Sequence, residues 1–171
     1  GYARASGQPG IMLAGQNGPG ATNLVTGIAQ AAAAFSPLIS IAGAIPTSDL
    51  IQDAFQGIDQ QSLFKPITKK TWTVTKTERI PEMFRDAFHL AMKPRRGPVH
   101  INLPRNILSK SANFKNSQYS QKNKSHKISS AKTNIIKKAA KMISSATQPV
   151  IIAGGGIKNT NGHTEVLALA K

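Results

Sequence analysis

The sequence predicts an α/β fold in which a parallel sheet is flanked by helices and is followed by the start of a second α/β domain. Short apolar runs bounded by glycine or proline occur at 10–14, 38–43 and 98–104, as expected for the buried strands of a parallel sheet. A helix-forming stretch, 21–34, separates the first two runs. Strand, crossover helix and strand, in this order, form the unit from which parallel sheets are built.

The elements that follow complete a first domain, which we expect to span 1–108. Residues 49–64 are typical of a polar loop with short helical turns, and 71–74 alternate as a strand with one buried face. Pro81 suits the first turn of a helix. After it, apolar residues recur on one helical face: Met83, Phe84, Ala87, Phe88 and Ala91.

The last third of the chain has a different composition. Residues 109–132 are rich in Lys, Ser and Asn, and a segment with so little apolar surface is expected to be a solvated linker. Residues 133–145 predict a basic amphipathic helix, and 150–153 predict a strand that enters the glycine turn 154–156. We expect 133–171 to be the beginning of an incomplete second α/β domain, because one crossover cannot enclose a core.

Composition excludes several classes of protein. The chain has 171 residues, of which 40% are hydrophobic, and it has no cysteine. The apolar share is too high for a disordered chain, and no apolar run is long enough for a transmembrane helix. The lack of cysteine rules out disulfides and thiolate metal sites and fits a reducing compartment, so we expect a cytoplasmic protein.

The formal net charge of +15 is unevenly distributed. Residues 1–108 hold eleven Lys and Arg against six Asp and Glu, whereas 109–171 hold eleven Lys against one Glu. Lysines of this kind can release counterions from a nucleic acid, so a basic nucleic-acid-associated protein is an alternative of another class. Residues 109–132 contain no Arg, the side chain that grips a phosphate with paired donors, and we therefore favour the linker.

Two segments of the first domain suit an anionic ligand or cofactor. The glycine turn 15–20 follows a strand and opens a helix, where backbone N–H groups converge, although a tight strand-to-helix connection would need the same glycines. Arg95 and Arg96 precede a strand and suit a phosphate, or else form a solvated basic corner. The histidines show no metal-ligand spacing, and we expect a packing role for His100, which lies inside a strand.

Several segments, taken in order, resemble thiamine-diphosphate-dependent enzymes of the acetolactate synthase large-subunit type. They are GYARASGQPG, GQNGPGATNLVTGIA, SPLISIAGAIPTSDLIQDAFQ, KPITKKTW, RRGPVHINLPRNIL and QPVIIAGGGI. The resemblance covers nearly the whole chain except the lysine-rich linker. It implies that 1–108 form most of the pyrimidine-binding domain, and that the central domain begins near residue 130.

The resemblance also implies a cofactor site. Gly18, Pro19, Gly20 and Asn23 match the GPG-x-x-N turn beside the pyrimidine pocket of thiamine diphosphate, and Gln56 matches a glutamine that approaches this cofactor. The diphosphate and Mg²⁺ are held by a different domain of the partner subunit in this family. Each site is then shared between two chains of a homodimer or tetramer.

The substrate channel and a possible FAD site follow in the same way. The residues that match the channel entrance are Pro46, Asp53, Ala54, Phe55 and Lys69. Arg95 falls where acetolactate synthases can hold FAD. The activity implied is decarboxylation of pyruvate and transfer of the two-carbon unit to a second 2-oxo acid, a step of branched-chain amino acid biosynthesis. Sulfoacetaldehyde acetyltransferase and an oxalyl-CoA decarboxylase-like enzyme are alternatives.

The chain departs from the family pattern at two places near the substrate. Gln16-Asn17 precede GPG, a pair that also resembles sulfoacetaldehyde acetyltransferases, and Gly57 stands where a glutamate usually follows F-Q. In the family, the glutamate that tautomerises the aminopyrimidine lies upstream of Gly1, and the metal-binding segment lies downstream of Lys171. The resemblance thus implies a fragment without catalytic residues or metal ligands of its own, which is inactive alone.

Overall fold

A computed structural model describes residues 1–15, 17–49, 53–114, 130–160 and 162–171 of the chain. The chain divides into two compact units, Gly1–Asn123 and Lys124–Lys171. Most of the predicted linker, residues 115–129, lies outside the described residues, and so does Gln16.

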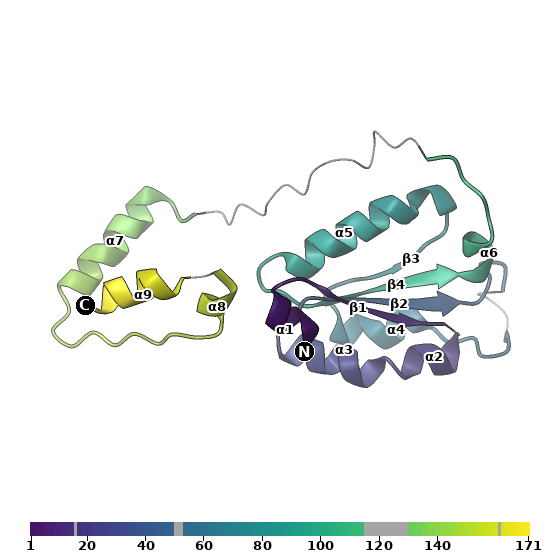
Figure 1. The fold of residues 1–171 in the computed structure, drawn as a ribbon, viewed down its shortest axis with the longest axis horizontal. Coiled ribbons are helices and arrows are strands. Elements are labelled where there is room, and N and C mark those ends of the chain that lie inside the picture. The colour runs from purple at the N-terminus through teal and green to yellow at the C-terminus, as the bar shows by residue number, and fades with distance from the viewer. Residues whose placement is uncertain (16, 50–52, 115–129, 161) are drawn as a thin grey trace. The chain divides into compact units, whose positions relative to one another are not determined.

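The first unit is built on one sheet of four parallel strands in the order β1-β2-β4-β3, flanked by helices as predicted (Figure 1). Leu38 of the central strand β2 is paired with the first residues of both β1 and β4, so these three strands are aligned at their amino ends. Loops that leave their carboxyl ends therefore meet at one edge of the sheet. The strands are β1 (Gly10–Ala14), β2 (Leu38–Ala44), β3 (Thr71–Thr73) and β4 (Pro98–Pro104).

Helices cover both faces of the sheet. On one face α5 (Ile80–Met92) packs against β2 and β4, and on the other face α3 (Val25–Ala33) contacts β2 and β4 while α4 (Gln60–Phe64) contacts β3 and β4 (Figure 1). Pro81 lies in the first turn of α5, as expected. The shorter helices of this unit are α1 (Tyr2–Ser6), α2 (Gly18–Thr22), η1 (Lys65–Ile67), η2 (Thr77–Arg79) and α6 (Arg105–Leu108).

The segment 21–34 forms parts of two helices instead of the single helix that the sequence predicts. The N–H of Leu24 bonds to the carbonyl of Ala21, three residues back, while Ile28 bonds to Leu24 at the regular spacing of four. This tighter step separates α2 from α3.

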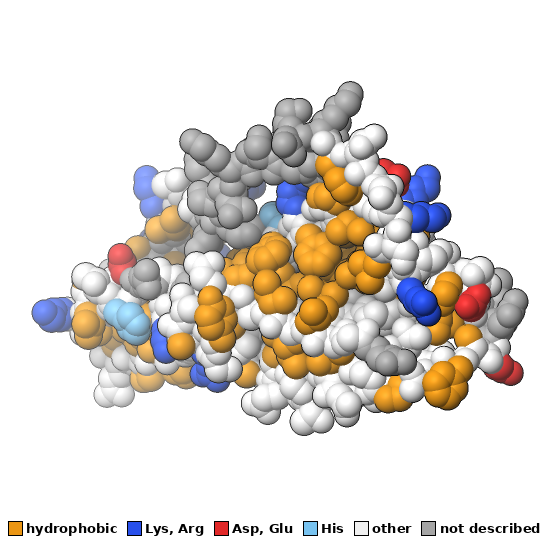
Figure 2. Space-filling view, turned by 45° about the vertical axis from the view of Figure 1, so that its right-hand side comes forward, with side chains coloured by type: hydrophobic (Ala, Val, Ile, Leu, Met, Phe, Trp, Pro, Cys, Tyr) orange, Lys and Arg blue, Asp and Glu red, His pale blue; other side chains and the backbone are white. Residues whose placement is uncertain are grey.

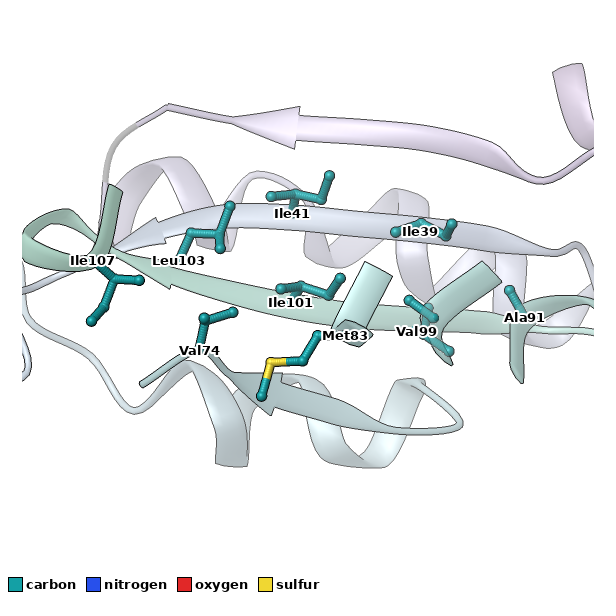
Figure 3. Packing of buried hydrophobic residues seen from close by; sticks show 10 residues of the cluster. Ile39, Ile41, Val74, Met83, Ala91, Val99, Ile101, Leu103 and Ile107 are labelled. Atoms are coloured by element: carbon teal, nitrogen blue, oxygen red, sulfur yellow. The ribbon is translucent and has the colours of Figure 1, made fainter. Parts of the chain in front are cut away.

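Alternate side chains of β2 and β4 form the core between the sheet and α5. Every second residue of these strands points to α5 and meets the small and apolar face of that helix (Figure 3). Burying one such aliphatic side chain stabilises the fold by about 1.5–3 kcal/mol. The buried residues of this layer are Ile39, Ile41, Val74, Met83, Ala87, Ala91, Val99, Ile101, Leu103 and Ile107.

The second unit consists of α7 (Thr133–Ser144), α8 (Gly156–Thr160) and α9 (His163–Ala170). The predicted basic helix is present as α7, but the prediction of a strand at 150–153 is wrong, because these residues have no regular structure. A strand needs a neighbour to pair with, and the described residues of this unit include no other strand. Val150 and Ile152 consequently remain 85% and 93% exposed.

The surface carries exposed apolar side chains as well as charge. Figure 2 shows a group of neighbouring hydrophobic side chains on the face that it draws. Large apolar side chains with high exposure include Leu13 at 74% and Phe55 at 86%. None of the described helices has both the length and the hydrophobicity that crossing a bilayer requires.

Candidate functional site

The candidate site lies where the loops leave the carboxyl ends of β1 and β2. In open parallel sheets, ligands bind in the crevice outside the carboxyl ends of the strands. The glycine turn follows β1 and leads directly into α2, whose first residues are Gly18, Pro19 and Gly20. Gly18 is buried, Pro19 is exposed, and Asn23 is exposed at the C-cap of α2.

A backbone hydrogen bond joins this turn to the loop that follows β2. The N–H of Gly18 donates to the carbonyl oxygen of Gln56 over 2.8 Å. A Cβ atom on residue 18 would lie 2.6 Å from the same oxygen, closer than any side chain tolerates. Glycine is therefore required at residue 18 for the two loops to touch.

The loop around Gln56 is a tight turn that presents an aromatic ring to solvent. The N–H of Gly57 donates to the carbonyl of Ala54 over 2.8 Å, and Gln56 has a φ of 60°, a left-handed conformation that costs a non-glycine residue energy. Phe55, at the first central position, is 86% exposed. Gln56 is half-buried.

The turn also explains the departure from the family pattern at Gly57. A Cβ on residue 57 would lie 2.9 Å from the carbonyl oxygen of Ala54 and 3.2 Å from Ile45. A glutamate here would force the turn to open. The local backbone of this chain is thus adapted to glycine.

The other predicted channel residues of this loop stay at the same edge. Pro46 is half-buried just beyond β2 and begins a turn in which the N–H of Asp49 donates to the Pro46 carbonyl over 2.9 Å. Asp53 is exposed and Ala54 is half-buried. Residues 50–52, which connect the two turns, lie outside the described residues.

Lys69 lies at the opposite end of the sheet. Its N–H bonds to the carbonyl of Pro98, the first residue of β4, so the seven-residue length of that strand, about 20 Å, separates it from the carboxyl edge. Its Nζ donates to the carbonyls of Leu90 and Lys93 at 2.6 and 3.0 Å, which end α5. Burial, with a smaller contribution from Lys93, lowers the pKa of Lys69. Within this chain Lys69 caps a helix.

Arg95 lies at the same amino end as Lys69. Its guanidinium carbon is 4.2 Å from the ring centroid of Phe35, in a cation–π contact. Phe35, at the end of α3, has a φ of 49°. The N–H of the next residue, Ser36, donates a hydrogen bond to the carbonyl of Ala31 over 2.9 Å. The geometry is that of a helix C-terminus for which glycine is the usual residue.

Sequence reasoning missed two amide side chains that fasten the carboxyl edge. Gln60 is 4% exposed, and its Nε2 donates to the carbonyl of Gly43 near the end of β2 over 2.7 Å. Its Oε1 has no partner among the described residues. Asn106, in α6, binds Thr47 through two hydrogen bonds. No local pattern could reveal these contacts, since 17 and 59 residues separate the partners.

His100 has the packing role that its position in a strand predicts. It is fully buried in β4 and stacks on Phe64, with ring centroids 3.8 Å apart. Asn102 donates through Nδ2 to Thr73, so its Oδ1 accepts the Nε2 proton of His100 over 2.6 Å, and Nδ1 of His100 accepts from the Ser40 hydroxyl over 3.0 Å. Burial lowers the pKa of His100 to about 4, against an opposing effect of the Asn102 hydrogen bond.

Two cavities of the first unit lie elsewhere. One, of about 480 Å³, is lined by α4, η1 and the segment that leads into β3, and includes Lys69 and Lys70. The other, of about 780 Å³, lies between α1, the start of β1 and α3. Within the described part of the chain, no three His, Asp or Glu side chains come together as metal ligands.

Comparisons with known proteins show which proteins this chain is similar to. Residues 1–63 match the family model of the thiamine pyrophosphate enzyme, N-terminal TPP binding domain. The whole chain is 44% and 43% identical to probable acetolactate synthase large subunits of Methanococcus aeolicus and Methanocaldococcus jannaschii. It covers 29% of the length of each of these relatives.

One further relative by sequence and one solved structure are also similar to this chain. The acetolactate synthase isozyme 1 large subunit of Escherichia coli is 38% identical over 98% of the chain, which covers 29% of that protein. A thiamine diphosphate-dependent 4-hydroxybenzoylformate decarboxylase from Rhodococcus jostii shares the fold with a TM-score of 0.87 at 23% identity, over 99% of this chain and 32% of that one. This chain is therefore similar along its whole length to acetolactate synthase large subunits, and its residues 1–63 match the family model of the N-terminal TPP binding domain of thiamine pyrophosphate enzymes.

Proposed function

We propose that the complete protein is a thiamine-diphosphate-dependent carboligase, an acetolactate synthase, which decarboxylates pyruvate and transfers the two-carbon unit to a second 2-oxo acid. The observation that carries the proposal is the hydrogen bond between Gly18 and Gln56, which joins the GPG turn to the aromatic-amide turn at the carboxyl edge of a parallel sheet. The relatives described above are acetolactate synthases, so we prefer this activity to sulfoacetaldehyde acetyltransferase, oxalyl-CoA decarboxylase or nucleic-acid binding.

The division of labour along the chain is part of the proposal. Residues 1–108 would form the pyrimidine-binding domain, 109–132 a linker, and 133–171 the start of the central domain. The sheet and its helices, which end at α6, support the first assignment. The second unit has no buried residues among those described, as expected for a piece whose apolar faces pack against further chain.

The residues at the carboxyl edge fit the pyrimidine side of thiamine diphosphate. Buried Gly18 lets the GPG turn touch the loop that carries Gln56, and Pro19, Gly20, Asn23 and Gln56 would line one side of the ring. When bound, this cofactor supplies the nucleophilic carbon and the electron sink for decarboxylation. Gln56 can orient polar atoms there without adding charge.

The second half of the site would come from a partner subunit. Phe55 is an apolar ring with 86% exposure on the turn that borders the proposed substrate entrance, together with Pro46, Asp53 and Ala54. Covering this ring with a second chain would exclude water from the entrance. We therefore propose a homodimer or tetramer, with Mg²⁺ and the diphosphate held by another domain of the partner.

Arg95 and Lys69, two of the predicted site residues, lie at the amino end of the sheet, away from the proposed cofactor side. Arg95 is exposed, so its guanidinium could bind a phosphate of FAD while it stays stacked on Phe35. Lys69 could border a channel only in the assembled protein, since its own chain uses it to cap α5. A cytoplasmic location is proposed with the same activity.

The test is to assay the complete gene product with pyruvate, thiamine diphosphate and Mg²⁺. Acetolactate should form, and Gly18→Ala should weaken binding of thiamine diphosphate at least tenfold, because the added methyl group separates the turns. Gly27→Ala is the matched control: its Cβ would meet only the flexible end of Met12, at 3.1 Å, so cofactor binding should be unchanged. Bound cofactor without acetolactate would refute the activity, and unchanged binding by Gly18→Ala would refute the site.

A further inference from the structure

We propose that Asn106 is a positioning residue for the entrance loop, which begins at Pro46 after β2 and ends at Gln56. Asn106 holds this loop through two hydrogen bonds to Thr47, which together we call the clasp. The clasp itself is a feature of this chain. Its consequence for the substrate rests on the proposed function, because the loop concerned carries Pro46 and Phe55.

The clasp pairs one amide with both polar groups of a threonine. The N–H of Thr47 donates to Oδ1 of Asn106 over 3.1 Å, and Nδ2 of Asn106 donates to Oγ1 of Thr47 over 2.8 Å. Both residues are half-buried, so water competes less for these bonds than at the surface. Making both bonds at once takes a side chain with two adjacent polar atoms, because the Thr47 hydroxyl can either accept or donate while the Thr47 N–H only donates.

Asn106 stands on a rigid support. It lies in α6, directly after β4, and the next residue, Ile107, is 2% exposed in the core below α5. The carbonyl of Ile107 accepts a buried hydrogen bond of 2.9 Å from the hydroxyl of Thr77. The loop after β2 is therefore attached to an element that is itself fixed by the core and by the segment after β3.

The clasp fastens one end of the entrance loop, and the glycine turn fastens the other. Thr47 is the second residue of the turn that begins at Pro46, so the clasp determines where Pro46 lies. The carbonyl of Gln56, ten residues after Pro46, accepts a hydrogen bond from the N–H of Gly18. Loss of the clasp should release the Pro46 end while the Gln56 end, and with it the cofactor side, stays attached.

Hydrogen exchange on this chain tests the clasp without any assay of activity. In Asn106→Ala the protection of the Thr47 amide should fall about tenfold, whereas the Gly18 amide should keep its protection. Asn106→Asp should restore protection, because a carboxylate can accept from both the N–H and the hydroxyl of Thr47. Asn113→Ala changes an exposed asparagine in the segment after α6 and serves as the control. Unchanged Thr47 protection in Asn106→Ala would refute the clasp.

Kinetics of the complete gene product test the positioning role. Asn106→Ala should raise KM for the 2-oxo acid several-fold and leave the dissociation constant of thiamine diphosphate unchanged, with rescue by Asn106→Asp. Thr47→Val, which removes only the hydroxyl, should give a smaller rise and covers the case in which Asn106→Ala folds poorly. Equal losses of substrate and cofactor affinity, or no rescue, would refute the positioning role. A wild-type protein that forms no acetolactate would refute the proposed function instead, and the exchange data would still decide the clasp.

Discussion

The buried histidine should make this protein sensitive to mild acid. His100 has a pKa of about 4 in the folded chain because burial disfavours its charged form, whereas an unfolded histidine titrates near 6.5. Between about pH 6.5 and pH 4 the unfolded chain binds a proton at this histidine, whereas the folded chain does not. The free energy of unfolding must therefore fall as the pH falls from about 6.5 to about 4, and above that window His100 has no effect on the pH dependence.

The size of the effect follows from the pKa difference. Each pKa unit corresponds to about 1.4 kcal/mol, so His100 should lower the free energy of unfolding by about 2 kcal/mol at pH 5 and about 3 kcal/mol at pH 4. That is a large part of the stability of an ordinary domain, which is about 5–15 kcal/mol.

Urea unfolding at a series of pH values measures this loss. His100→Gln removes the titrating group, so its stability should depend less on pH than that of the wild type by about 3 kcal/mol between pH 7 and pH 4, even if the variant is less stable at pH 7. His89→Gln, at an exposed position on α5, is the control and should follow the wild type. Parallel curves for wild type and His100→Gln would refute the buried, neutral histidine.

Three further substitutions test contacts of the first unit by chemical denaturation. Lys69→Met should cost about 1 kcal/mol by uncapping α5, while Lys65→Met, at a neighbouring exposed lysine, should cost less; equal costs would contradict the capping role. Phe35→Ala and Phe35→Gly both lose the contact with Arg95, but only alanine keeps the strain of the left-handed backbone. Phe35→Ala should therefore be less stable than Phe35→Gly by about 1 kcal/mol; the reverse order would show that the strain is negligible. Gly57→Ala should destabilise the chain by about 1–3 kcal/mol, because the new methyl group meets the Ala54 carbonyl, and an unchanged urea midpoint would show that this turn opens freely.

The sequence predicted the parallel sheet because the signal for it is local. An apolar run such as 38–43 or 98–104 can be buried on both faces only in a sheet covered by helices, and the glycines and prolines at its ends mark where it stops. The same local reasoning predicted a strand at 150–153 and was wrong. An apolar run becomes a strand only when another strand lies beside it, and the described residues of the second unit offer none.

Residue patterns likewise predicted which segments could touch a cofactor, but only the tertiary structure decided which of them lie together. Strand direction brings Gly18 and Gln56 into contact and sends Lys69 and Arg95 to the other end of the sheet. The clasp of Asn106 on Thr47 depends on a partner 59 residues away, and the neutral state of His100 depends on its burial in the folded chain. The order of residues specifies local propensity and burial pattern, whereas hydrogen bonds between distant side chains exist only once the strands have been placed side by side.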